Sequence, residues 1–368
     1  MAETLPDTNS IARRYGRRAL GATLTVLALV LLGTGCGEPK QFPEGVPGKG
    51  PDEIAAASSA TGHYQRGIEL FDAGRYRKAI ESFRASVRAN PDDPRPYLEI
   101  GACYSRLDDP KRELAAYDEA LAVSPDFAPA HNSRGVALLR LDRVEDAVAA
   151  FEKALKLEVD YAPAHVNIAI AYSRLGNYEL ALMSLGNAEQ FGASTFDVAA
   201  NRGLVLVELK RYREAADAFA RALQERPGYY PVRFERAMAL AKDGRTQEAL
   251  LELERLTTMQ PGFDQAYLEK ARLLSGSERL AYSLDQYTEY LSRVPKDAQA
   301  WNEKGNVHFA CGQYERAEAC FRKAVKYKRG FYNAYRNLAA TLEELGRHRE
   351  ARSVLRKAER YKPKDVSE

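Results

Sequence analysis

Cys36 is the residue of this sequence whose surroundings point most directly to a covalent event. The five residues before it read LLGTG, and the run from Ala19 to Leu32 holds 14 uncharged, mostly apolar residues. Arginines precede that run at positions 13, 14, 17 and 18. A positive segment, a short apolar run and small residues are typical of a secretory signal peptide, and the run is shorter than the roughly 18 residues of a membrane-spanning helix. The sequence therefore predicts export, with a thiol directly after the expected cleavage point.

The same residues resemble a bacterial lipoprotein signal, in which the cysteine is acylated and becomes the mature N-terminus. Gly35 and Cys36 match that signal, whereas Gly33 stands where the family usually has Leu, Val or Ile. The resemblance implies a signal peptide over residues 1–35, a lipid on Cys36 and a place in the bacterial cell envelope, with the outer membrane favoured by Gly37. Two alternatives remain open: a soluble periplasmic or secreted protein cut by an ordinary signal peptidase, and an uncleaved signal anchor.

Charge and motifs exclude several other classes of function. The formal net charge is +3, and removing residues 1–35, with their four arginines and two acids, leaves +1. A nearly neutral chain has no general electrostatic attraction for nucleic acid. The sequence contains no metalloprotease, nucleophile-elbow or nucleotide-loop motif. We therefore expect no catalytic residue, no cofactor, no metal, no nucleic acid and no small-molecule substrate.

A segment rich in proline and glycine follows the cysteine. Within residues 36–59, prolines recur every four residues at positions 39, 43, 47 and 51, with glycines between them. Regularly spaced proline opposes a helix, because each one removes a backbone donor and clashes with the preceding turn. We expect residues 36–59 to be an extended tether that carries the lipidated cysteine.

From Ala60 onward the sequence repeats every 34 residues without insertion. We number the positions of each repeat from 1 to 34. The nine repeats cover residues 60–93, 94–127, 128–161, 162–195, 196–229, 230–263, 264–297, 298–331 and 332–365, and a tail of residues 366–368 follows. Position 8 is always Gly or Ala and position 24 is always large and apolar, as Gly135 and Phe151 illustrate. Two helices approach closely only at small side chains, so this pair predicts a helix crossing within every repeat.

Turn residues separate the two helices of each repeat. Position 15 is often Gly, which suits the end of a first helix, and position 32 is often Pro, which stops a second helix. This pattern, most complete in Trp301, Gly305, Tyr314, Ala317, Phe321 and Ala324, resembles the tetratricopeptide repeat family. The resemblance implies an all-α fold, a right-handed α-solenoid of nine helix-turn-helix repeats, whose concave groove binds a protein or peptide.

The seventh repeat departs from the pattern. Its position 15 is Glu278, while Gly276 comes two residues earlier, and Tyr290 stands where Ala is usual. We expect the segment Arg272–Leu280 to open more easily than the matching segments of the fifth and eighth repeats.

The histidines and the remaining cysteines fit packing better than chemistry. His63, His131 and His165 occupy position 4, where other repeats have Tyr or Trp, and His308 and His348 lie at positions 11 and 17. We interpret them as substitutes for aromatic residues. We interpret Cys103, Cys311 and Cys320 as small packing residues, with a Cys311–Cys320 disulfide as the alternative for an oxidising compartment.

The face of each first helix opposite the core is the candidate binding surface. At 100° per residue, positions 2, 5, 6, 9, 12 and 13 fall on that face, which lines the concave groove in the family. The predicted peptide-binding residues are Arg106, Arg140 and Arg174 at position 13, Asn132, Asn167 and Asn201, and the apolar Val136, Leu139, Ile170 and Leu204. An apolar segment with acidic residues would fit this lining. The alternatives are a solvated edge for the arginines and packing against neighbouring helices for the apolar residues.

The last two repeats are strongly basic. Between Glu318 and Asp365 there are 14 Lys and Arg residues and 6 acids, a net charge of +8. Such a surface suits an anionic lipid, a polyanion or an acidic partner. The alternative is a solvated end cap that binds none of them. From all these features we expect a membrane-anchored adaptor that binds partner proteins and possesses no catalytic activity; a non-catalytic subunit that positions an enzyme is a further alternative.

Overall fold

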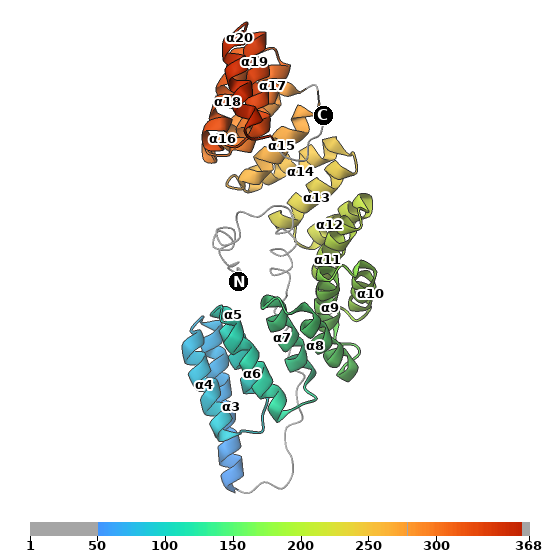
Figure 1. Cartoon of the computed structure of the whole chain (residues 1–368). Coiled ribbons are helices and arrows are strands. Elements are labelled where there is room, and N and C mark those ends of the chain that lie inside the picture. The colour runs from blue at the N-terminus through green and yellow to red at the C-terminus, as the bar shows by residue number, and fades with distance from the viewer. Residues whose placement is uncertain (1–50, 278, 363–368) are drawn as a thin grey trace. The chain divides into compact units, whose positions relative to one another are not determined.

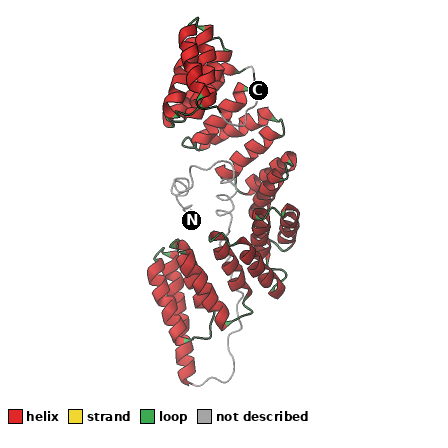
Figure 2. Ribbon diagram, viewed as in Figure 1, coloured by secondary structure: helices red, strands yellow, loops and turns green. Residues whose placement is uncertain are grey.

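The computed structural model describes residues 51–277 and 279–362, and side chains from residue 59 onward. In this part of the chain all regular structure is helical, and short turns join the helices (Figures 1 and 2). The helices are α3 (Pro51–Asp72), α4 (Tyr76–Ala89), α5 (Arg95–Arg106), α6 (Pro110–Val123), α7 (Ala128–Arg140), α8 (Val144–Leu157), α9 (Ala162–Arg174), α10 (Tyr178–Gln190), α11 (Thr195–Glu208), α12 (Tyr212–Glu225), α13 (Tyr230–Lys242), α14 (Thr246–Met259), α15 (Asp264–Ser275), α16 (Leu280–Arg293), α17 (Ala298–Ala310), α18 (Tyr314–Tyr327), α19 (Tyr332–Glu344) and α20 (His348–Glu359).

The helices form consecutive antiparallel pairs, from α3 with α4 to α19 with α20, and each pair corresponds to one sequence repeat. The expected fold class, an all-α solenoid of helical repeats, is confirmed. The chain divides between Arg226 and Pro227 into two compact units. Within each unit, a helix packs mainly against the helices directly before and after it in the chain.

In the repeats other than the seventh, the inner turn has a left-handed residue at position 15. Gly74, Gly176, Gly244, Gly312 and Gly346 all adopt a positive φ there. Asp108, Asp142 and Lys210 take the same conformation at that position, with φ between 58° and 61°. Non-glycine residues rarely adopt this conformation, because the Cβ atom approaches the following carbonyl oxygen. The turn geometry of the repeat therefore overrides the preference of these three side chains.

The predicted crossing of the two helices is confirmed at position 8. A Cβ atom added to Gly135 would lie 2.4 Å from Cε1 of Phe151, which is fully buried. In their own repeats, Gly67, Gly101, Gly203 and Gly305 are covered in the same way by the aromatic ring at position 24. These glycines allow a large ring to lie flat against the first helix, and the ring forms the centre of each repeat's core.

Position 4 carries a hydrogen bond that recurs between consecutive repeats. Trp301 Nε1 donates to the carbonyl oxygen of Pro295 at 2.9 Å. Other side chains at this position contact the carbonyl six residues earlier: His131 with Pro125 and His165 with Val159, both at 2.8 Å, and Arg233 with Pro227 at 2.7 Å. At these four positions a nitrogen on a flat side chain contacts the same carbonyl, and His and Trp both provide one.

The packing interpretation of the histidines is correct for three of them. His165 is buried and stacks on Phe191, His308 is buried, and burial lowers the pKa of His131. It is wrong for His63 and His348, which are exposed. His63 lies in the first repeat and His348 in the last. Each of these repeats has a neighbouring repeat on one side only.

Two further expectations need correction. Cys103 and Cys320 are buried as packing residues, but Cys311 is exposed, and the three thiols are free.

The predicted tether is too long, because α3 already begins at Pro51. Proline is tolerated in the first turn of a helix, where its missing N–H would have no partner, and the alanine-rich residues after it favour helix. Residues 36–50, including Cys36, and the signal segment lie outside the described residues.

Candidate binding surfaces

The predicted position-13 arginines connect each repeat to the one before it. Arg140, at the end of α7, donates to Ser105 Oγ at 2.9 Å and to Asp108 Oδ1 at 3.0 Å, and it also pairs with Glu113. Asp108 is a left-handed turn residue, 32 positions earlier. The side chain of Arg140 is 17% exposed, so most of it is enclosed by these partners.

Arg174 repeats this arrangement one repeat later. It donates to the carbonyl oxygen of Leu139 at 2.8 Å and pairs with Asp142, again a left-handed turn residue 32 positions earlier. Arg106 is exposed, and its guanidinium lies 5.9 Å from the centre of the Phe71 ring. Each arginine therefore contacts the preceding repeat, Arg140 and Arg174 through a turn aspartate and Arg106 through an aromatic ring.

The carboxyl group of Glu113 is the most unusual partner in this arrangement. It is 1% exposed on α6, next to Arg140. Burial raises its pKa to about 7, while the positive charge of Arg140 acts in the opposite direction. Arg140 therefore has a structural role, because its positive charge compensates the buried carboxyl group of Glu113.

Two of the three predicted asparagines are hydrogen-bonded between neighbouring first helices. Asn167 Nδ2 donates to Asn132 Oδ1 at 2.9 Å, and both side chains are buried. Asn201 donates to the carbonyl oxygen of Asp197 within its own helix at 2.8 Å. In the second unit Asn337 donates to Asn302 at 3.0 Å, which is the same 35-residue spacing. The amides satisfy each other, as buried polar groups must.

The predicted apolar residues contribute to the core of the first unit. Leu139, Ile170 and Leu204 are buried, and Val136 is half-buried against the same cluster as Leu139 and Ile170. The structure thus brings the ten predicted residues together along the first helices, but it engages most of them with neighbouring repeats. Peptide binding by these residues stays a prediction.

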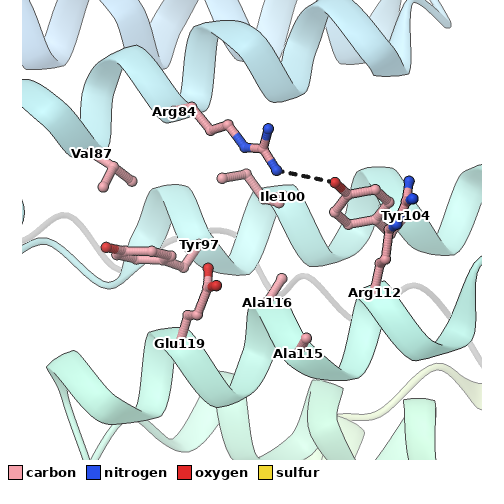
Figure 3. Close-up of a pocket in the computed structure, with 9 residues that line it drawn as sticks. All are labelled: Arg84, Val87, Tyr97, Ile100, Tyr104, Arg112, Ala115, Ala116 and Glu119. Carbon is pink, nitrogen blue, oxygen red and sulfur yellow. Dashed lines mark hydrogen bonds between the residues drawn. The ribbon is translucent and has the colours of Figure 1, made fainter.

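A recess that the sequence analysis did not identify lies between α4 and α6, with α5 as its floor (Figure 3). Its volume is about 500 Å³, within the range of ligand pockets. The lining residues are Arg84 and Val87 of α4, Tyr97, Ile100 and Tyr104 of α5, and Arg112, Ala115, Ala116 and Glu119 of α6.

The two ends of the recess differ in charge. Figure 3 shows Arg84, Tyr104 and Arg112 near one end and Tyr97 with Glu119 at the other. Arg84 Nη2 donates to the phenolic oxygen of Tyr104 at 3.3 Å, and the guanidinium of Arg112 lies 5.8 Å from the centre of the Tyr104 ring. The recess therefore has a cationic end, an apolar floor and an acidic end.

The two cations distinguish this recess from the corresponding positions elsewhere. Arg84 and Arg112 occupy position 25 of one repeat and position 19 of the next. The following pairs of these positions in the chain are Asp118/Asp146, Glu152/Leu180, Gly186/Glu214, Ala220/Glu248, Glu254/Tyr282, Thr288/Arg316 and Arg322/Glu350. The first pair alone combines two cations. The residues at these positions can be compared from the sequence alone. The pair of cations becomes significant only because the structure places positions 19 and 25 opposite each other.

The basic C-terminal surface is concentrated on α20. Arg349, Arg352 and Arg356 are exposed on this helix, and Arg360 is exposed just beyond it. At 100° per residue they fall within one stripe, opposite the buried Ala351 and Ala358. Its interaction with a lipid, a polyanion or an acidic partner stays a prediction.

Between residues 51 and 362, position 278 excepted, no cluster of three or more His, Cys, Asp or Glu side chains is arranged to hold a metal ion. In the same residues no helix has both the length and the apolar character that crossing a membrane requires.

Comparison with protein-family models agrees with the paired-helix architecture. Three models, each described as tetratricopeptide repeat, match the chain at residues 64–197 in overlapping segments, at 206–273 and at 296–364. The chain belongs to the tetratricopeptide repeat family. No curated protein matches the sequence of this tetratricopeptide repeat protein.

Solved structures show the same fold at low sequence identity. A structure titled as the functional characterization of Pseudomonas aeruginosa PilF is 16% identical, with a TM-score of 0.53, and the match covers 61% of this chain and 100% of that one. The C-terminal part of a repeat protein from Cytophaga hutchinsonii is 18% identical, with a TM-score of 0.51 and coverage of 65% and 98%. The hetero-tetramer Cut9–Hcn1 of the APC/C is 12% identical, with a TM-score of 0.50 and coverage of 87% and 62%.

Proposed function

We propose that this tetratricopeptide repeat protein is a membrane-anchored adaptor of the bacterial cell envelope, which holds partner proteins on its helical repeats. The observation that carries the proposal is the continuous series of paired helices from α3 to α20, matched by tetratricopeptide repeat models over most of its length. Repeats of this kind present extended surfaces, and their stability comes from contacts between neighbours rather than from a closed core.

Support for the anchor comes from the sequence around Cys36. Positive charge, an apolar run and small residues precede a single cysteine, and no described helix could serve as a membrane span instead. A lipid on this thiol would attach the adaptor to a membrane, and the proline-rich residues before Pro51 would separate the repeats from its surface.

Labelling cells with a radioactive fatty acid tests the anchor. We expect label in the wild-type protein and none in the Cys36→Ser variant, with Cys103→Ser as the control that retains the label. Export without label, with the mature chain beginning at Cys36, would replace the anchored adaptor by a soluble exported one.

Photo-crosslinking in the intact envelope tests partner binding. A photoreactive amino acid at Arg106 and another at Ala115 would sample both faces of the first repeats. We expect a discrete protein adduct at one of these positions, and mass spectrometry identifies its partner. Absence of any adduct, with the chain correctly exported, contradicts the adaptor.

A further inference from the structure

We propose that the recess between α4, α5 and α6 is a second binding site, which takes a segment of a partner protein carrying an acidic side chain beside an apolar one. The inference rests on the proposed function, because it assumes that the chain binds proteins. It adds a site formed by the second helices α4 and α6 with the first helix α5 between them, which uses other residues of α5 than the predicted Arg106, and it names the chemistry of the occupant.

The cationic end is arranged to hold a carboxylate. Arg84 is exposed and donates one hydrogen bond, to the oxygen of Tyr104. Because that oxygen accepts from Arg84, the phenolic O–H of Tyr104 can donate to a ligand. A carboxylate between Arg84 and Arg112 would accept from both guanidinium groups and from this phenol, and charge-assisted bonds of this kind are the strong ones.

Arg112 is able to turn toward such a ligand. It forms an ion pair with Asp109, at 3.5 Å, and its side chain is 70% exposed. Exposed pairs of this length contribute little free energy, so a ligand carboxylate competes with Asp109 at low cost.

The floor of the recess fits an apolar side chain. Ala115 and Ala116 of α6 are small, and Ile100 of α5 lines the recess together with them. Figure 3 shows the ring of Tyr97 beyond these residues and Glu119 next to it. A second acidic residue of the ligand would be repelled by Glu119, so the segment has a preferred direction: carboxylate toward Arg84, apolar side chain over the alanines.

The same register in a later repeat lacks this chemistry. Glu152 takes the position of Arg84 two repeats later, and Tyr172, the counterpart of Tyr104, donates to it at 3.1 Å. There an acid already occupies the place that a ligand carboxylate would fill. Nucleic acid is a poor alternative for the recess, because a polyanion would meet Glu119 and only two cations.

Selection from a random heptapeptide library displayed on phage, with the full chain as target, tests the site. We expect selected peptides to contain Asp or Glu next to an apolar residue. Binding of their synthetic copies should weaken on the order of tenfold or more in an Arg84→Glu/Arg112→Glu variant, because two charge-assisted contacts become repulsive. It should also weaken in an Ala115→Trp variant, which fills the recess without changing its charge.

The matched control is Arg316→Glu/Arg322→Glu, the same two repeat positions within the eighth repeat. It changes the net charge equally and should leave peptide affinity unchanged. Equal weakening in the control, full affinity in the Ala115→Trp variant, or no selected acidic-apolar peptide would each overturn the site. Peptides that bind equally to all variants would overturn the site while leaving protein binding intact, whereas the crosslinking experiment tests the adaptor itself.

Discussion

At the scale of single residues, the glycine at position 8 decides whether the two helices of a repeat can meet. The aromatic ring at position 24 lies where a Cβ atom would be, so the small residue and the ring form one unit. This dependence was visible in the sequence as two columns of the repeat, but the contact distance comes from the structure.

Replacing Gly135 with Ala should lower the free energy of unfolding by about 1–3 kcal/mol, because the new methyl group would displace Phe151. Gly186 is the control: it lies within α10 with no neighbouring atom inside 4 Å, and Gly186→Ala should raise the free energy of unfolding by about 0.5–1 kcal/mol. Urea denaturation measures both. Equal effects of the two substitutions would contradict the role of the crossing.

Removing the positive charge next to Glu113 should lower the stability of the folded chain, because a buried acid is unfavourable without a compensating charge. The variant Arg140→Met should lose roughly 1–3 kcal/mol of stability at pH 8, because Glu113 must then either ionise without a compensating charge or bind a proton from a basic solution. The double variant Arg140→Met/Glu113→Gln should recover part of this loss. An identical stability of the single and double variants would refute the argument.

The same pair predicts a dependence on pH. Burial raises the pKa of Glu113 in the folded chain to about 7, above its ordinary value of 4.5. Between these values the folded state binds more protons than the unfolded state, so the contribution of Glu113 to stability falls as pH rises through that window. Arg140→Met should raise the pKa further, and its stability should therefore lie closer to that of the wild type at pH 5 than at pH 8. Denaturation at the two pH values checks this.

At the scale of elements, the seventh repeat differs from the others in the turn between its two helices, as its sequence predicts. α15 ends at Ser275 and α16 begins at Leu280, so four residues join them, whereas three residues join α11 to α12 and α17 to α18. Gly276 has a φ of −80° rather than the left-handed value of the other turn glycines. Tyr290, in contrast, is well accommodated: it is buried and donates to Asp297 at 2.8 Å.

Hydrogen exchange should therefore be faster in residues 272–280 than in residues 204–212 or 306–314, because the longer turn places more of the backbone outside the helices. Mass spectrometry of deuterium uptake by the native chain measures the three segments together. Equal protection of the three would show that the turn length has no effect on local stability.

At the scale of the whole molecule, stability should be local. Helices pack mainly against their chain neighbours, and the chain divides into two compact units at Arg226 and Pro227. Interactions of this kind sum along the chain instead of sharing a single core.

The variant Gly135→Ala should therefore increase deuterium uptake in α7 to α9 and leave uptake in α17 to α19 unchanged. Gly305→Ala, which changes the same position in the second unit, should show the reverse distribution, because its added Cβ would lie 2.5 Å from Phe321. Increased uptake along the whole chain in either variant would indicate one cooperative unit.

The sequence by itself determined the period of 34 residues, the two helices of each repeat, the glycine–aromatic crossing and the turn positions. It also supplied the signal around Cys36, about which the described residues say nothing. These features follow from local rules: a backbone conformation, a helix end or a close approach depends on residues near in the chain, and repetition makes each rule visible many times.

Only the tertiary structure decided what the polar side chains contact. The sequence placed Arg140 and Arg174 on the face opposite the core, yet their partners lie 27 to 35 residues earlier, in the preceding repeat. The recess likewise combines side chains of three helices, and Arg84 and Arg112 show no pattern until positions 25 and 19 are known to face each other. Whether a polar group is available to a partner depends on which neighbouring groups already satisfy it, and that is a property of the folded chain.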